Sequence, residues 1–77
     1  MPRYTTEKIF TYLETDETLA LIVTANGGSL VTSSFDGVGY VTADTINTDL
    51  VTEYYVKGQT LKFTPSGGCT FSIRGGT

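Results

Sequence analysis

Short apolar stretches recur along the chain at intervals of about ten residues, separated by turns that contain glycine. This spacing is typical of an antiparallel all-β sandwich or barrel. The predicted strands cover 19–24, 29–34, 38–43, 50–56, 59–64 and 69–74, and tight turns are expected at 25–28, 35–37, 57–58 and 65–68. We therefore predict a single β domain over residues 1–77, with roughly six or seven short strands and tight glycine-containing hairpins.

The stretch 69–74 shows the alternation of a half-buried strand most clearly. Cys69, Phe71 and Ile73 fall on one side of an extended chain, and the residues between them are polar. Such alternation is typical of an antiparallel strand with one face on the core and the other in water. Cys69 is therefore expected to point inward as a small apolar residue. Residues 44–49 are mostly polar and are interpreted as a connecting loop.

The N-terminal segment, residues 1–18, allows two interpretations. Ile9, Phe10 and Leu13 have the spacing of an apolar stripe on a helix. The same segment is rich in threonine and aromatic residues, which favours an extended strand. We favour an extended N-terminal arm, and a helix is the alternative.

Two of the predicted strands are apolar on both faces. In the predicted strand 19–24, Ala20 and Ile22 point to the side opposite Leu19, Leu21 and Val23. In the predicted strand 50–56, Val51 and Tyr55 point to the side opposite Leu50, Tyr54 and Val56. A second apolar face suggests that another chain covers it, or that the N-terminal segment 4–13 folds over it. Small domains often gain stability by oligomerising. Tyrosine is also enriched at interfaces. The residues predicted to form the interface are Ala20, Ile22, Tyr40, Val51 and Tyr55.

The composition removes several kinds of chemistry. Histidine is absent, and Cys69 is the only cysteine. A cysteine nucleophile would lack a base, and a lone cysteine makes neither an internal disulfide nor a zinc site. The acidic run 14–17 lacks the spacing of a calcium loop and is interpreted as a solvated turn. We predict that the protein is not an enzyme and that it has no catalytic residue, metal or cofactor.

The charge pattern bears on partners. Eight acidic and five basic residues give a net charge of −3, and no two bases are adjacent. Nucleic-acid binders usually show a basic stripe, so neither a nucleic acid nor an anionic membrane surface is expected as a partner. No apolar run approaches the roughly 20 residues of a membrane-spanning helix. The first eight residues lack the apolar stretch of a signal peptide.

Residues 54–73 resemble, in texture, the small accessory virion proteins of tailed bacteriophages; they read YYVKGQTLKFTPSGGCTFSI. The resemblance lies in the size, the threonine-rich strands, the missing signal peptide and the absence of catalytic groups, and it carries over no individual functional residue. Such decoration or cement proteins are often compact β-folds that dimerise or trimerise on the capsid lattice. The resemblance implies a structural protein of the virion, assembled in the host cytoplasm, whose partners are further copies of itself or a capsid or other particle protein.

The alternative is a small ligand- or carbohydrate-binding β-module. In that case Tyr40, Tyr54 or Tyr55 is expected to serve as a stacking platform for the ligand. The absence of tryptophan, the best platform of this kind, counts against this alternative.

Overall fold

The computed structural model describes residues 3–75 and forms seven strands. They are β1 (Lys8–Thr11), β2 (Thr18–Thr24), β3 (Ser29–Phe35), β4 (Tyr40–Ile46), β5 (Leu50–Tyr55), β6 (Thr60–Ser66) and β7 (Thr70–Gly75). All the strand pairings are antiparallel. Residues 3–75 contain no helix, and hence none that could cross a membrane. The predicted antiparallel all-β class is confirmed.

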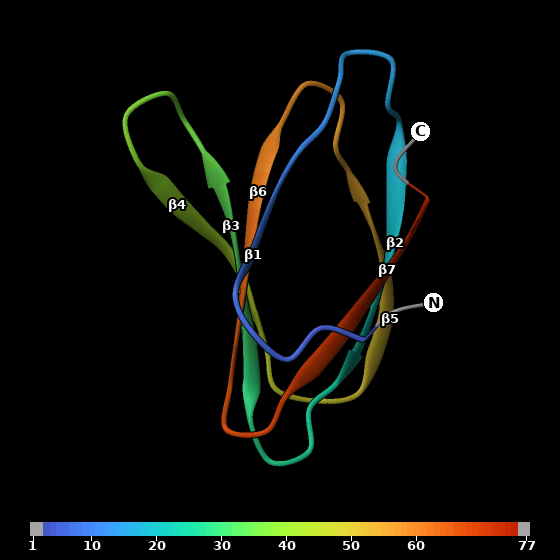
Figure 1. Cartoon of the computed structure of the whole chain (residues 1–77), viewed down its shortest axis with the longest axis vertical. Helices are drawn as coiled ribbons and strands as arrows, with labels where there is room; N and C mark the ends of the chain where they lie inside the picture. Colours follow the sequence, from blue (N-terminus) through green and yellow to red (C-terminus); the bar gives the residue numbers. More distant parts are fainter. Residues whose placement is uncertain (1–2, 76–77) are drawn as a thin grey trace.

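The strands form two sheets that lie face to face as a sandwich (Figure 1). One sheet has the order β1-β6-β3-β4, and the other has the order β5-β2-β7. The edge strands β4 and β5 are linked by a hydrogen bond of 2.9 Å that the Tyr54 hydroxyl donates to the Asp44 carboxylate. The two sheets therefore meet through side chains at this side of the sandwich.

The turns fall at or next to the predicted positions, although Phe35 lies in β3 and Pro65 and Ser66 lie in β6. Most of them connect the strands differently from what the sequence suggests. A hydrogen bond of 2.7 Å from Gly28 N to Ala25 O closes the first turn. However, β3 and β4 are the only consecutive strands that pair, and every other connection among the described strands crosses between the sheets. The β3–β4 connection is thus a glycine-containing hairpin, as expected, whereas the other described connections are not hairpins. A turn of glycine and asparagine reverses the chain without selecting the sheet that the next strand joins.

The core lies between the inward faces of the two sheets. In β2 the alternation is as expected, because Leu19, Leu21 and Val23 are buried. Phe63 from one sheet and Phe71 from the other are also buried. The complete buried cluster consists of Leu19, Leu21, Val23, Leu30, Ile46, Val56, Leu61, Phe63, Cys69 and Phe71.

The N-terminal segment is extended and packs on the core. β1 pairs with β6, and Phe10 lies opposite Leu61 in the register. Before β1, Tyr4 and Phe71 exchange two backbone hydrogen bonds of 2.7 and 3.0 Å. The rings of Tyr4 and Phe10 lie 5.8 Å apart between centroids. The segment thus joins β7 of one sheet to β6 of the other, and the helical alternative does not hold for Lys8–Thr11.

Strand β4 is displaced from the predicted strand 38–43, since it begins at Tyr40 and leaves Val38 and Gly39 in the turn. It continues through Asp44 to Ile46, so the loop expected at 44–49 is confined to 47–49. The register between β3 and β4 shifts after Thr32, and this shift leaves Ala43 as an extra residue in a bulge. A bulge bends its strand and increases its twist. In Figure 1 the far end of the β3–β4 hairpin diverges from β6.

Candidate association surfaces

The outer face of the β5-β2-β7 sheet brings together four of the five residues predicted for the interface. In the register, Ala20 lies opposite Glu53, and Ile22 lies opposite Val51. The outward side of β5 also carries Tyr55, since it alternates with the partly buried Tyr54. Val51 is 69% exposed and Tyr55 is 60% exposed. These outward positions of β2 and β5, together with Thr70, Ser72 and Arg74 of β7, are called the β2 face below.

The β2 face exists because the inward positions of its strands are already committed to the core. Leu19, Leu21 and Val23 are each 2% exposed or less. Ala20 and Ile22 alternate with them and therefore point outward, where they are half-buried. The second apolar side of β2 is thus left without a covering layer in residues 3–75. The interface remains a prediction, but the outward apolar side of β2 on which it rests is found in the structure.

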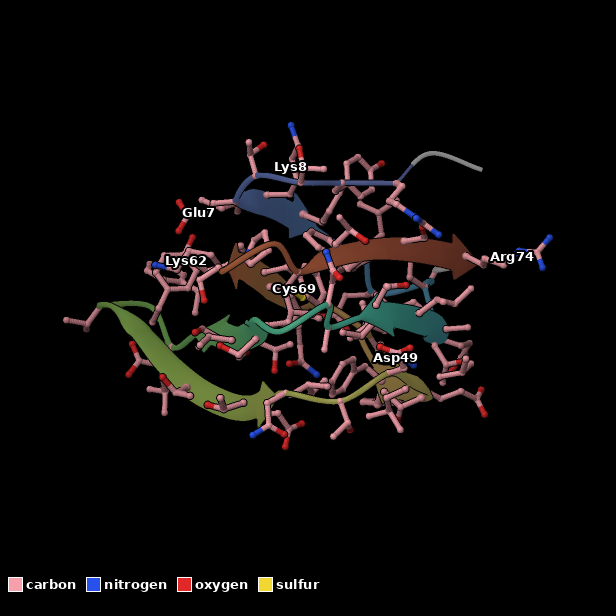
Figure 2. The ribbon with its side chains drawn as sticks, turned by 90° about the horizontal axis from the view of Figure 1, so that it is seen from below. Glu7, Lys8, Asp49, Lys62, Cys69 and Arg74 are labelled. Atoms are coloured by element: carbon pink, nitrogen blue, oxygen red, sulfur yellow. The ribbon has the colours of Figure 1, made fainter. Side chains whose placement is uncertain are left out.

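The β2 face carries one charge at each edge. Ala20 pairs with Glu53 of β5 on one side and with Arg74 of β7 on the other. Both charged residues are exposed. Figure 2 shows Arg74 projecting away from the sandwich, on the side opposite Lys62. The two charges have opposite signs and share one row across the sheet.

Tyr40, the fifth predicted residue, lies on the other sheet and does not belong to the β2 face. It pairs with Phe35 at the end of the β3–β4 hairpin, and the two rings are 5.2 Å apart. The Lys62 ammonium lies over the Tyr40 ring, 4.2 Å from its centroid, which is a favourable cation–π distance. The five residues therefore divide between two surfaces.

The tip of the β3–β4 hairpin is a second exposed apolar surface, which the sequence analysis missed. Val38 is 94% exposed, and Val41 is 57% exposed. The tip is held by Asp36, whose Oδ1 accepts hydrogen bonds of 2.9 Å from the backbone N–H groups of Val38 and Gly39. The same hydrogen bonds lower the pKa of the Asp36 carboxyl. The sequence analysis places Val38 in a strand, whereas it lies in the turn before β4, and this difference is why the exposed tip was missed.

A small cleft lies between β5 and the opposite sheet. Its volume is about 70 Å³, whereas ligand pockets usually measure about 300–1,000 Å³. Its lining consists of Thr32, Ser33, Ser34, Ala43, Tyr54, Tyr55, Gln59, Leu61 and Phe63. Two of its polar side chains already donate hydrogen bonds: the Tyr54 hydroxyl donates to Asp44 of β4, and Ser34 donates to Gln59 Oε1 at 3.1 Å.

The tyrosines proposed as a stacking platform do not come together. Tyr54 is half-buried, and burial raises the pKa of its hydroxyl. Tyr55 lies on the outward side of β5, and Tyr40 lies on the other sheet. A flat sugar ring therefore meets no continuous aromatic surface formed by these three residues.

The remaining reactive groups have structural roles. Cys69 is buried just before β7, in the connection between β6 and β7 at one end of the sandwich (Figure 2), and burial raises the pKa of its thiol. In the acidic run, Asp16 Oδ2 accepts a hydrogen bond of 2.7 Å from Leu13 N and so shapes the turn before β2. Within residues 3–75, no group of three or more histidine, cysteine, aspartate or glutamate residues could hold a metal ion.

The chain was compared with protein-family models, with curated proteins and with solved structures, and none of the three comparisons found a match.

Proposed function

We propose that this chain is a structural assembly protein that binds a larger particle, and that its specific role is capsid decoration in the virion of a tailed bacteriophage. The observation that carries the proposal is the presence of two separate exposed apolar surfaces on one 8.3 kDa domain. One is the β2 face with Val51 and Tyr55, and the other is the hairpin tip with Val38. Exposed apolar surface of this kind commonly marks a site of protein association.

Two surfaces suit a protein that contacts both its own copies and a lattice. The β2 face is broad and is formed by three strands. The hairpin tip is narrow and is held in one shape by the Asp36 hydrogen bonds. A preorganised tip loses little conformational entropy on binding. We assign the hairpin tip to the particle and the β2 face to association between copies.

The roles of the aspartates support a structural rather than a catalytic protein. Each of the four accepts a hydrogen bond that fixes the fold: they are Asp16, Asp36, Asp44 and Asp49. Asp49, for example, accepts a hydrogen bond of 2.9 Å from Ala25 N and so ties two connections together. The hydrogen bond that each aspartate accepts thus gives it a structural role in its turn or strand.

The test uses the particle whose capsid or tail genes neighbour the gene for this chain. Purified protein is mixed with these particles and centrifuged through a density gradient. We expect the wild type to travel with the particles and Val38→Asp to stay at the top, since the substitution places a charge at the tip. Thr48→Asp, which adds the same charge at an exposed position in 47–49, serves as the control and should behave as the wild type.

The opposite outcomes are equally clear. A wild type that never travels with these particles contradicts the proposal. Retention of the wild type on immobilised glycans, combined with no particle binding, favours the carbohydrate-binding module instead. Unchanged melting temperatures for both variants show that the result concerns binding rather than folding.

A further inference from the structure

We infer that the β2 face binds a second copy of this chain around a two-fold axis parallel to β2, with Glu53 of each copy facing Arg74 of the other. The inference rests on the proposed function only in taking the β2 face as an association surface. It adds the identity of the partner, the symmetry and the pair of residues that selects the arrangement.

Both charged residues of the β2 face lie in one row across the sheet. Glu53 and Arg74 both pair with Ala20, so the three residues lie at the same level along the strands. Neighbouring strands are about 4.8 Å apart, which places the two charged residues roughly 10 Å apart on either side of Ala20. The other outward positions of these strands carry no charge; they are Thr18, Ala20, Ile22, Thr24, Val51, Tyr55, Thr70 and Ser72.

Symmetry then selects the arrangement of the two copies. In a two-fold dimer the same patch faces itself, and for two sheets packed face to face the axis lies between them. A two-fold axis parallel to β2 places the β5 edge of one copy over the β7 edge of the other. It leaves each residue at the same height along the strand direction in both copies. It therefore sets Glu53 opposite the partner's Arg74, and Arg74 opposite the partner's Glu53. An axis across the strands at the same level sets each charge opposite its own copy, which is repulsive.

The apolar residues fit the same arrangement. Ala20 lies at the centre of the charged row, and its small side chain permits close approach of the two sheets. At the next outward level Ile22 meets the partner's Ile22, beside Val51, which is exposed, whereas Ser72 at the same level is buried. Packed sheets lie about 10 Å apart and within about 30° of parallel, a rotation that the long glutamate and arginine side chains can follow.

The size of the face sets the expected strength. Three strands of six or seven residues span a flat area of roughly 14 by 23 Å. This is less than the ~800 Å² per partner that is common in stable interfaces. We therefore expect a weak dimer in free solution, with a dissociation constant of about 10 μM to 1 mM. On a particle, the high local concentration of bound copies would favour the same contact.

The experiment is a charge exchange, read by sedimentation velocity of the purified protein at about 10 μM to 1 mM. Glu53→Arg alone and Arg74→Glu alone each set like charges against one another in both symmetric contacts. We expect each single variant to weaken association about tenfold or more. The variant that carries both substitutions regains opposite charges and should associate within about threefold of the wild type.

The design separates this pairing from an effect of net charge. Glu53→Arg brings the net charge of −3 closer to zero, and Arg74→Glu moves it further away. An effect of net charge alone would strengthen association in the first variant and weaken it in the second. Lys8→Glu, on the opposite sheet, changes the net charge as Arg74→Glu does and should leave the dimer unchanged.

Three results would overturn the inference: a wild type that stays monomeric at about 1 mM, single variants that shift in opposite directions, or a double variant that does not recover. None of these measurements involves the particle. Particle binding that depends on Val38, together with a failed charge exchange, would leave the proposed function standing and remove only this dimer.

Discussion

The phenyl rings of Phe63 in β6 and Phe71 in β7 pack against each other across the sandwich, with their centroids 5.4 Å apart. Each ring comes from a different sheet, and both side chains are buried. Phe10 packs on Phe63, and Tyr4 packs on Phe71. This aromatic contact therefore links both sheets and the N-terminal segment in one cluster.

Phe63→Ala is expected to unfold the protein. Truncating a buried phenylalanine costs about 3–5 kcal/mol, which is similar to the total stability expected for a domain of this size. Phe35→Ala removes a ring that is 43% exposed and should cost less than about 1 kcal/mol. Urea unfolding followed by circular dichroism measures both, and equal midpoints for the two variants would show that the cluster does not hold the sheets together.

Gly28→Ala is expected to lower the melting temperature by at least about 8 °C, which corresponds to a cost of about 2 kcal/mol. A methyl group at Gly28 would overlap the backbone carbonyl of Ser66 and lie 2.7 Å from the carbonyl carbon of Gly67. Neither backbone can move without separating two turns at one end of the sandwich. Gly39→Ala is the matched control, because a methyl group there meets no atom within 4 Å. Similar melting temperatures for the two variants would contradict the close approach of these turns.

Tyr12 is expected to ionise late. Burial, and then the nearby Asp16 carboxylate, raise the pKa of its hydroxyl to about 12. An unfolded tyrosine ionises near pH 10, so this group stabilises the fold fully below about pH 10. The contribution is lost as the pH rises from about 10 to about 12.

The absorbance of the tyrosinate ion, followed against pH, measures this effect directly. We expect a late component in the wild type that decreases in Tyr12→Phe but does not vanish, since burial also raises the pKa of Tyr54. If Tyr12→Phe removes signal only from the part of the titration near pH 10, the Tyr12 hydroxyl is not buried as described, and the prediction is contradicted.

Cys69 is expected to be inert in the native protein. Burial, and then the Asp49 carboxylate, raise the pKa of its thiol, which lowers the fraction of reactive thiolate at neutral pH. Alkylation should therefore be slow in buffer and fast in concentrated urea. Cys69→Ala should cost only about 1 kcal/mol or slightly more, as expected for a small buried group, and a chelator should not change the melting temperature. Rapid alkylation of the folded protein would contradict this prediction.

The sequence predicted the strands and their inward sides because both depend on local alternation. Leu19 and Phe71 are core residues, as their positions in the pattern indicate, and Cys69 lies on the same side as Phe71. Local alternation does not predict which strands pair with one another. The pairing of Ser29 with Ser66, for example, joins residues 37 positions apart, and no local feature of either turn specifies it.

The sequence-based placement is wrong for three residues whose neighbours in the fold are distant in sequence. The sequence places Asp44 in a loop, but it lies in β4, where its exposed carboxylate accepts a hydrogen bond from the Tyr54 hydroxyl. Pro65 was assigned to a turn, but it lies in β6 beyond Phe63, where β1 ends and β6 has a neighbour on one side only. Tyr40 was grouped with the β2 face on residue type alone, since nothing local indicates which sheet a strand will join.

The most direct test of the β2 face as an association surface is sedimentation velocity of the wild type and Tyr55→Asp at matched concentrations. Tyr55 is 60% exposed and lies outside the buried cluster, so the substitution should leave the fold intact. Thr45→Asp, at an exposed position on the other sheet, is the control for added charge. We predict that the wild type and Thr45→Asp associate alike and that Tyr55→Asp associates about 30-fold more weakly, which corresponds to about 2 kcal/mol. A wild type that remains monomeric at about 1 mM, or a Tyr55→Asp variant that associates as the wild type does, would contradict the account.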